Sequence, residues 1–551
     1  MRKNIFGTIL FAAALAIAAI SCQKSMDEFG ATAGNDGTID IKVNAAMGQY
    51  SPAEATKAER VAVTRVSWKG GETVYVYDGT QYLGSLVTTL DGTEDRYALL
   101  STDATHTVEK PADGTTKLTL VYSPLLTTAP TVSEGTISVS LVNQSGATAP
   151  FVAFATLDYI NGQSLAITKE VVPFKLATSL INVSSTGAAA NSDVYMVWIE
   201  GLNTECTLTL HGDKEPEAGG AGNGHIKRTE ATGFDASSVG AEGGVIFQLA
   251  VPPVEKSQGT RKLFIFQRNE TAFVDRGFSK AQLASGVAVN TVCSLKELVI
   301  PEGAIPIPFE LEGRLIWFSK GNLQAKYNNQ TKKYEWGFAN SQLDFVGDKS
   351  GNTTIKDNGK NEDGAVVDLF CWTAKGKHSD GMKQYGINKS ETYSDYCTTD
   401  FRSDQLSDCG DAYCISKGIS TGTWYTPSAD QWRYLIDKNN GTKYGDVLIT
   451  RTYSGFVVLP EDYSGTLDTK LLNYLSWDDW QNMEKAGAVF LPYAGYRQGN
   501  TVLENSHHYQ TSTSQDETVH FSAYSSLGGR KIYESTYRYE AAAVRLISDI
   551  K

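Results

Sequence analysis

Short runs in which apolar and polar residues alternate fill residues 37–300, and this period of two most constrains the fold. Examples are Thr38-Ile-Asp-Ile-Lys-Val, Glu72-Thr-Val-Tyr-Val-Tyr and Lys117-Leu-Thr-Leu-Val-Tyr. Successive side chains of a strand point to opposite faces of a sheet, so each run predicts a strand with one buried face. Turn pairs such as Asp78-Gly79 and Asn161-Gly162 separate the runs. Many short strands without long helical periodicity predict β-sandwiches.

The start of the chain reads as an export signal. Two basic residues precede an uncharged apolar run at residues 5–20, which is shorter than the roughly 20 residues of a membrane-spanning helix and suits a signal-peptide core. The run ends in Ala19-Ile-Ser-Cys22, which resembles the lipobox of bacterial lipoproteins. The resemblance implies that residues 1–21 are a signal peptide and that Cys22 is acylated, which would anchor the chain in the outer membrane. An ordinary secretory signal is the alternative.

A polar tether follows at residues 22–36 and includes Asp27-Glu28. This acidic pair resembles the tags that route lipoproteins to the cell surface in Bacteroidetes, and a solvated linker is the equally weighted alternative. The formal net charge of the chain is −13. Because affinity for nucleic acid rests largely on Lys and Arg, we expect no nucleic-acid partner.

Two phrases in the second half of the β-rich region resemble the fimbrillin family of Bacteroidetes. They are Val172-Pro-Phe-Lys-Leu-Ala-Thr-Ser-Leu-Ile-Asn-Val and Asp193-Val-Tyr-Met-Val-Trp-Ile-Glu-Gly-Leu. The resemblance implies two mainly-β sandwich domains of the fimbrillin or transthyretin-like type, at residues 37–170 and 171–300. Such domains would act as stalk or assembly modules with other fimbrial subunits as partners. An unrelated pair of sandwiches serving as a spacer remains open.

Residues 301–308 contain three prolines in eight positions, a composition that predicts an extended, semi-rigid linker. Beyond it, five phrases resemble the C-type-lectin-like domains of Bacteroidetes surface proteins, a fold shared with formylglycine-generating enzymes and with the variable proteins of diversity-generating retroelements. The resemblance implies an α+β domain at residues 309–551. The five phrases are Phe318-Ser-Lys-Gly-Asn-Leu-Gln, Asp368-Leu-Phe-Cys-Trp, Trp424-Tyr-Thr-Pro-Ser-Ala-Asp-Gln-Trp-Arg-Tyr-Leu, Gly487-Ala-Val-Phe-Leu-Pro-Tyr-Ala-Gly-Tyr-Arg and Ala543-Val-Arg-Leu.

Two helices are expected in this domain. Thr426-Pro-Ser places a capping residue beside proline, and Trp432 and Leu435 follow at helical spacing. A second helix is expected over residues 477–486.

No catalytic constellation stands out, so an enzyme is not expected. Formylglycine-generating relatives hold copper through cysteines near the C-terminal end, and no cysteine follows Cys414 here. Gly418-Ile-Ser-Thr-Gly lies in a predicted loop rather than between a strand and a helix, so it does not form a nucleophile elbow. His507 and His508 are neighbours on a strand and point to opposite faces, which predicts surface polar contacts and no joint metal site. We expect no cofactor, and an acidic loop at residues 357–363 reads as solvated.

The cysteines of the lectin-like segment suggest disulfides, which persist in exported proteins. Relatives carry Gly at the position of Cys371 and Trp at the position of Cys409. The resemblance therefore implies a disulfide between Cys371 and Cys409, with Cys397 and Cys414 as a second candidate pair. Reduced, buried thiols are the alternative.

The ligand-binding surface is expected between residues 499 and 542, a stretch rich in Tyr, Ser, Thr and His. Tyrosine supplies rigid contact area, and small polar residues supply adaptable hydrogen bonds. In the resembling family the corresponding strands form an exposed binding face, and the usual Trp of its "YWSST" phrase is replaced here by Gln510. The residues expected to contact a ligand are Asn505, His507, Tyr509, Gln510, Ser512, His520, Ser522, Tyr524, Tyr533, Ser535, Tyr537 and Tyr539.

These features together predict a surface lipoprotein that binds an extracellular protein or glycan through its C-terminal domain. A position at the tip of a fimbrium is the first hypothesis, and retroelement-driven diversification of the C-terminal segment is an open possibility within it. A non-fimbrial lipoprotein that captures glycan or peptide is the second. An envelope enzyme is the third and lacks a reactive constellation.

Overall fold

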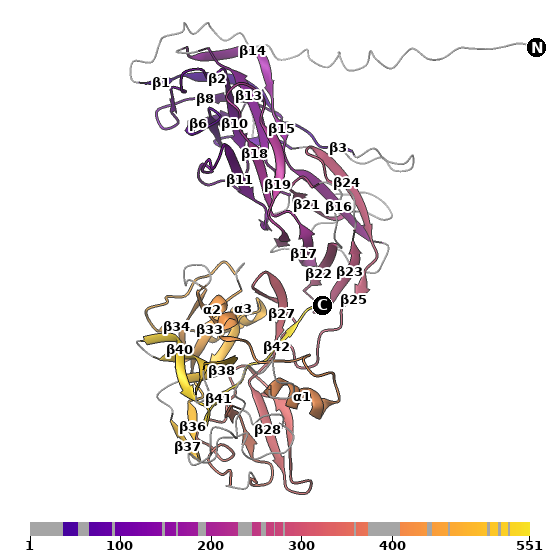
Figure 1. Cartoon of the computed structure of the whole chain (residues 1–551), viewed down its shortest axis with the longest axis vertical. Coiled ribbons are helices and arrows are strands. Elements are labelled where there is room, and N and C mark those ends of the chain that lie inside the picture. The colour runs from indigo at the N-terminus through magenta and orange to yellow at the C-terminus, as the bar shows by residue number, and fades with distance from the viewer. Residues whose placement is uncertain are drawn as a thin grey trace, which may run out of the picture.

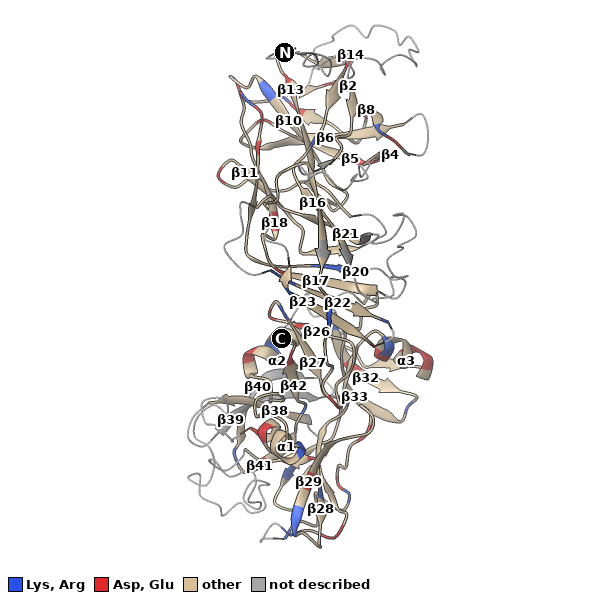
Figure 2. Cartoon of the chain, turned by 90° about the vertical axis from the view of Figure 1, so that its right-hand side faces the viewer, with Lys and Arg blue, Asp and Glu red and all other residues tan. Residues whose placement is uncertain are grey.

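The computed structural model is an elongated, mostly β molecule with three short helices in the described residues (Figure 1). The N-terminal strands form one half and the strands and helices after residue 308 form the other, and a view turned by 90° shows the same division (Figure 2). The described residues are 37–52, 66–90, 94–145, 149–160, 163–185, 194–229, 245–254, 261–268, 270–278, 282–356, 360–372, 408–437, 443–460, 463–503, 507–515, 519–526 and 529–551.

A 10-stranded sheet dominates the first part of the chain. Its main path runs in the order β14-β2-β8-β6-β5-β10-β13-β15, and β1 and β9 join from the side. The strands are β1 (Thr38–Ile39), β2 (Ile41–Ala46), β5 (Thr73–Tyr77), β6 (Tyr82–Thr89), β8 (Tyr97–Ser101), β9 (Val108–Glu109), β10 (Lys117–Tyr122), β13 (Ala153–Asp158), β14 (Leu165–Pro173) and β15 (Lys175–Leu176).

Smaller sheets complete the N-terminal half, and all of them except β4-β7 continue toward the middle of the molecule (Figure 2). Their orders are β11-β18-β19, β12-β20-β17-β22-β23-β25, β21-β16-β24-β3 and β4-β7. The strands are β3 (Ser51–Pro52), β4 (Trp68–Lys69), β7 (Glu94–Asp95), β11 (Thr136–Ser140), β12 (Asn143–Ser145), β16 (Ser179–Ser185), β17 (Val194–Leu202), β18 (Glu205–Thr209), β19 (Glu217–Ala221), β20 (Gly224–Thr229), β21 (Val245–Val251), β22 (Arg261–Gln267), β23 (Ala272–Phe278), β24 (Val287–Cys293) and β25 (Lys296–Glu297).

The chain passes between these sheet systems more than once, so the expected boundary at residue 170 does not separate their strands. β14 runs past that point and stays paired with β2, because its Val172 is buried in the first core. Conversely, β11 and β12 pair with β18 and β20 of the later sheets. Strand β5 shows how closely the two parts are joined. Its Val74 and Val76 face one core, whereas Tyr75 and Tyr77 face the next.

The half after residue 308 mixes strands with all three helices. Its sheets run β26-β27-β42, β29-β28-β30, β37-β36-β41-β38-β39-β40 with β31 attached to β41, and β34-β32-β33-β35. The two expected helices are confirmed as α2 and α3, and α1 was not expected. The elements are β26 (Phe309–Leu311), β27 (Arg314–Phe318), β28 (Leu323–Asn328), β29 (Lys333–Phe338), β30 (Val366–Val367), β31 (Leu369–Phe370), α1 (Cys409–Lys417), α2 (Ala429–Asp437), β32 (Tyr444–Ile449), β33 (Tyr453–Val458), β34 (Asn473–Leu475), α3 (Trp477–Lys485), β35 (Val489–Pro492), β36 (Tyr496–Gln498), β37 (Thr501–Leu503), β38 (His507–Ser514), β39 (Val519–Ser526), β40 (Gly529–Tyr537), β41 (Glu540–Ala543) and β42 (Ile547–Asp549).

One hydrophobic core crosses the junction between the two halves. Strand β17 is apolar on both faces: Val197 and Ile199 point into the core of the N-terminal half, and Trp198 points the other way. Trp198 lies in a buried cluster that also contains Phe266 of β22 and Trp317 of β27. The rings of Phe266 and Trp317 meet edge to face with their centroids 6.0 Å apart. The C-terminal half therefore covers an apolar sheet face that would otherwise meet water.

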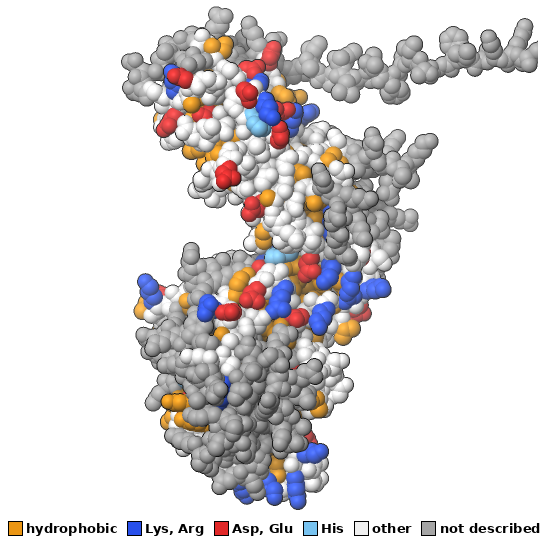
Figure 3. All heavy atoms as spheres, viewed as in Figure 1, with side chains coloured by type: hydrophobic (Ala, Val, Ile, Leu, Met, Phe, Trp, Pro, Cys, Tyr) orange, Lys and Arg blue, Asp and Glu red, His pale blue; other side chains and the backbone are white. Residues whose placement is uncertain are grey.

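Buried polar groups cross the same junction. The imidazole of His225 stacks on Trp198 with the ring centroids 3.5 Å apart. The Glu310 carboxylate of β26 lies 3.5 Å from the Lys227 ammonium, and only 4% of Lys227 is exposed. A buried charge that loses its partner is strongly destabilising, so this pair favours one relative placement of the halves. On the face shown in Figure 3, acidic and basic side chains gather where the halves meet.

The proline-rich segment at residues 301–308 is not the expected spacer. Ile305 is buried in the core of the C-terminal half, and its N–H donates to the carbonyl of Phe318 over 2.7 Å. Ala304 forms a bridge with Ser319. The prolines still favour an extended backbone, and apolar residues between them pack against the adjoining half. The linker prediction is therefore wrong.

The start of α1 rests on a buried carboxylate. Asp408 caps the helix by accepting the Gly410 N–H over 2.8 Å, and it also accepts the N–H and the hydroxyl of Thr426. Burial raises the pKa of Asp408 to about 6 from its ordinary value of 3.8, although these hydrogen bonds act in the opposite direction. The folded state therefore holds a proton on Asp408 at a higher pH than the unfolded state does.

Replacing Phe266 with Ala should lower the free energy of unfolding by about 3–5 kcal/mol, because the ring fills the core between the halves. Proteases should then cut the segment around residues 301–308 faster. Phe345→Ala is the matched control, because Phe345 is 36% exposed. Urea unfolding followed by tryptophan fluorescence, together with limited proteolysis, measures both effects. Equal behaviour of the two variants would contradict the shared core.

Replacing Asp408 with Asn should change how the stability of the protein depends on pH. As the pH falls from 7 to 5, Asp408 takes up a proton in the folded state before it does so in the unfolded state, which stabilises the wild type and not the variant. The free energy of unfolding of the wild type minus that of the variant should be about 1 kcal/mol more positive at pH 5 than at pH 7. Urea titrations at both pH values measure it, and a difference that stays constant or shrinks at pH 5 would refute the assignment.

Candidate recognition surface

The C-terminal half buries three of the residues that were expected to contact a ligand. Tyr509, Gln510 and Ser512 of β38 have 4%, 0% and 3% of their surface exposed. The Gln510 side-chain amide donates to the carbonyl of Phe370, and the Gln510 carbonyl accepts the indole N–H of Trp432 in α2 over 3.2 Å. For these three residues the binding-face prediction is wrong. The reason is that β38 lies inside its sheet and packs against α2.

Tyr509 shows the structural role that this strand has instead. Its hydroxyl donates to the carbonyl of Pro492 over 3.1 Å and lies within hydrogen-bond distance of the Asn322 side chain. These bonds tie β38 to the ends of β35 and β28. Its neighbour His508 is also buried, contrary to the expected surface position, and packs edge to face on Tyr496 at 4.9 Å. Burial lowers the pKa of His508 to about 4, so a neutral imidazole belongs to this core.

Other expected contacts fall outside the described residues or the described side chains. Asn505 lies outside the described residues, and so does Cys22. The backbone of β39 and β40 is described and pairs antiparallel, with His520 opposite Thr536 and Ser522 opposite Glu534. The expected strands are therefore present. The side chains outside the described set are those of His507, His520, Ser522, Tyr524, Tyr533 and Ser535.

Among the expected contacts whose side chains are described, Tyr537 is exposed and Tyr539 is half-buried against the C-terminal core. Tyr537 is 46% exposed, and its ring stacks on Tyr539 with the centroids 5.2 Å apart and the planes at 6°. The Glu540 carboxylate accepts the backbone N–H of Tyr537 over 3.1 Å and also accepts the side-chain amide of Gln498. The tyrosine pair is thus fixed to two neighbouring strands.

The residue between the two tyrosines anchors them from below. Arg538 is fully buried, and its guanidinium lies over the Trp372 ring, 5.2 Å from the centroid. It also donates to the Ser514 hydroxyl over 2.7 Å. Arg538 and Tyr539 form the turn between β40 and β41, and Arg538 points into the core while Tyr537 stays exposed.

A neighbouring hairpin enlarges the accessible area. In β36 and β37, Tyr496 pairs with Leu503, and Gln498 of β36 pairs with Glu540 of β41. The sequence Gln498-Gly-Asn-Thr carries the turn signal of this hairpin, which sequence reasoning overlooked because it concentrated on later strands. We use the name tyrosine surface for Tyr496, Gln498, Leu503, Tyr537, Tyr539 and Glu540. Strands β36 and β37 lie toward the end of the C-terminal half that is farther from the N-terminal sheets, whereas β40 lies nearer to them (Figure 1).

Two further properties bear on what the site can do. Among the described residues, no three His, Cys, Asp or Glu side chains are grouped so that they could hold a metal ion. Within the same residues, no helix has the length and apolar character needed to cross a membrane.

The expected disulfide between Cys371 and Cys409 is not formed. Cys409 is a free, buried thiol at the start of α1, and it belongs to a different buried cluster from Cys371. Cys414 is also a free thiol, and Cys397 lies outside the described residues. Burial raises the pKa of both α1 thiols above the ordinary value. The cysteines of α1 therefore act as small apolar residues in the core.

Iodoacetamide should label Cys409 and Cys414 in protein that is purified and unfolded in the absence of a reductant. In the folded protein both should react slowly, because they are buried and mostly protonated. Peptide mass spectrometry of samples alkylated before and after denaturation measures this. Labelling that appears only after reduction would restore the disulfide prediction.

No protein-family model matches the sequence, and the search of curated proteins gives no match. Solved structures give weak likenesses. A "putative cell adhesion protein" from Bacteroides uniformis is 12% identical, with 48% of this chain and 96% of that one covered and a TM-score of 0.29. A fimbrial assembly protein from Parabacteroides distasonis is 10% identical, with 54% and 99% covered and a TM-score of 0.22. The tip fimbrial protein Mfa3 from Porphyromonas gingivalis, truncated at its C-terminus, is 9% identical, with 48% and 83% covered and a TM-score of 0.22. At these TM-scores the likenesses carry no conclusion about this chain.

Proposed function

We propose that the chain is a cell-surface adhesin that binds an extracellular protein or glycan through the tyrosine surface of its C-terminal half. The observation that carries the proposal is the stacked pair of exposed Tyr537 and half-buried Tyr539, which flank the buried Arg538. Tyrosine is enriched at binding hot spots, because it offers a large amphipathic surface and loses little conformational freedom.

The pair is also arranged in advance of binding. Glu540 holds the backbone at Tyr537, and buried Arg538 holds the intervening turn. A surface that is already ordered spends less conformational entropy when a partner binds. Aromatic residues on a fixed sheet therefore suit a recognition role better than a loose loop would.

The rest of the chain would hold this surface away from the cell. The core shared by Trp198, Phe266 and Trp317 joins the two halves without a free spacer. In this proposal the N-terminal sheets are fimbrillin-like stalk modules that contact other fimbrial subunits. Acylated Cys22 would anchor the chain in the outer membrane and place it at the cell surface.

The finer assignment of the C-terminal half is part of the same proposal. The five phrases that resemble C-type-lectin-like domains, together with the α+β composition, support that fold for residues 309–551. If the half is diversified by a retroelement, the variable codons would lie between Arg497 and Val544. Genomic DNA would then carry a nearby copy of this coding segment that differs only at adenines.

The binding role can be tested with a Tyr537→Ser, Tyr539→Ser double variant of the full chain. Wild type, double variant and a Tyr97→Ser control would be applied to an array of extracellular-matrix proteins and oligosaccharides. Tyr97 is 52% exposed and lies in β8 of the N-terminal half. We expect the double variant to lose binding about 30-fold or more, the effect of removing a hot spot, and the control to bind like wild type.

Thermal unfolding of all three proteins would check that the folds are equal. Binding that survives in the double variant, or that is lost in the Tyr97 variant instead, would refute the proposed location of the site.

A further inference from the structure

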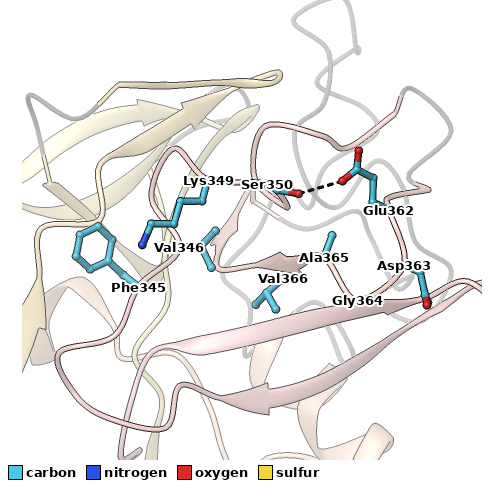
Figure 4. A pocket seen from close by; sticks show the side chains of 9 residues that line it. All are labelled: Phe345, Val346, Lys349, Ser350, Glu362, Asp363, Gly364, Ala365 and Val366. Atoms are coloured by element: carbon cyan, nitrogen blue, oxygen red, sulfur yellow. Dashed lines mark hydrogen bonds between the residues drawn. The ribbon is translucent and has the colours of Figure 1, made fainter.

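A cleft lies on another part of the C-terminal half, in the long loop between β29 and β30. Its volume is about 370 Å³, within the range of sites for small molecules. Figure 4 shows it from close by. Val346, Ala365 and Val366 supply apolar side chains, Phe345 stands at one end, and charged side chains lie around them.

The cleft is built on a buried polar network. The Asp368 carboxylate is fully buried and accepts the N–H of Val346 over 2.6 Å and the side-chain amide of Asn352 over 2.7 Å. The same Asn352 amide donates to the carbonyl of Gly347 over 2.8 Å. These hydrogen bonds to Asp368 and Asn352 therefore fix the loop segment that carries Phe345 and Val346.

The opposite side of the cleft is fixed in the same way. Buried Asn361 donates to the carbonyl of Gly351 over 2.9 Å and accepts the hydroxyl of Thr354 over 2.6 Å. Gly351 has φ 115°, and a Cβ there would lie 1.8 Å from the carbonyl oxygen of Val366. Only glycine permits this close approach. Both sides are thus ordered before any ligand arrives, which lowers the entropic cost of binding.

Charged side chains of both signs line the cleft. Lys349 lies on the side of Phe345, and Glu362 and Asp363 lie on the other side (Figure 4). A second lysine, Lys326, approaches Gly364 at the same rim, with its Cε 3.7 Å from where a Cβ would stand. Among the lining residues one ammonium group stands against two carboxylates, so an anionic ligand gains little from the site as a whole.

The chemistry of the rim favours hydroxyl groups. Glu362 accepts the Ser350 hydroxyl over 3.2 Å through one oxygen, which leaves the carboxylate able to accept further donors. Lys349 offers an ammonium donor, and hydrogen bonds to charged groups are stronger than neutral ones. Phe345 and the valines offer an apolar surface. A ring with an apolar C–H face and hydroxyls along its edge complements both features.

We propose that this cleft binds a neutral pyranose unit, whose C–H face would lie on Phe345 and the valines while its hydroxyls bond to Lys349 and Glu362. The site is separate from the tyrosine surface and goes beyond the adhesive role. A sugar that enters here needs neither a metal ion nor Tyr537.

Saturation-transfer NMR and calorimetry of the full chain with methyl glucoside, methyl galactoside and methyl mannoside test this directly. We expect at least one of these glycosides to bind, and Phe345→Ala and Glu362→Ala each to weaken it about tenfold. N-acetylneuraminic acid, which is anionic, should bind more weakly than the best neutral sugar. Both variants alter exposed side chains, so their melting temperatures should match that of wild type.

Two controls separate this site from the adhesive one. Tyr97→Ala and the Tyr537→Ser, Tyr539→Ser double variant should bind the same methyl glycoside as wild type does. Failure of all three neutral glycosides to bind would overturn the proposal, as would binding that is unchanged in both Phe345→Ala and Glu362→Ala. A preference for the anionic sugar would also overturn it, because the charge argument would then be wrong. Loss of binding only in the tyrosine variant would move the sugar to the tyrosine surface.

Discussion

The apolar outer face of strands β17 and β22 is the constraint on which the rest of the molecule depends. Trp198 and Phe266 on that face would cost several kcal/mol if they met water, and the C-terminal half covers them. The buried pair of Lys227 and Glu310 then favours one orientation of the cover over others. Because of this junction, the recognition surface occupies a defined position on the molecule.

Much of the architecture could be predicted from local pattern, because strand alternation and helix capping are encoded over a few residues. The β-rich half and helices α2 and α3 follow from such patterns. The packing of residues 301–308 could not be predicted, since proline content reports the backbone but not what Ile305 packs against. A signal for the junction was present: in Val194-Tyr-Met-Val-Trp-Ile both alternating faces are apolar, which is typical of a strand buried on both sides.

The candidate site could be predicted only in part, because composition is visible in the sequence whereas burial depends on packing. Composition indicated a Tyr- and Ser-rich region, and Tyr537 is accessible within it. Composition cannot tell which strand of a sheet is interior, so buried Gln510 was included wrongly. The pairing of Cys371 with Cys409 was inferred from two departures from a family pattern, and substitution alone does not report distance. The cleft beside Phe345 escaped notice because its lining residues come mostly from one irregular loop without strand or helix periodicity, and buried contacts such as that of Asn352 with Asp368 set the shape of this loop.

The junction holds the C-terminal half rigidly, so that it presents its surface from a fixed position. Pulsed electron–electron double resonance measures the distance between spin labels placed at Tyr97 and Tyr474. Attaching the labels through keto amino acids at these positions avoids the native thiols. Both side chains are exposed, one in each half. We expect a single narrow distance distribution that persists when Glu312, an exposed residue near the junction, is replaced by Gln. A broad distribution, as a flexible linker would give, would contradict it.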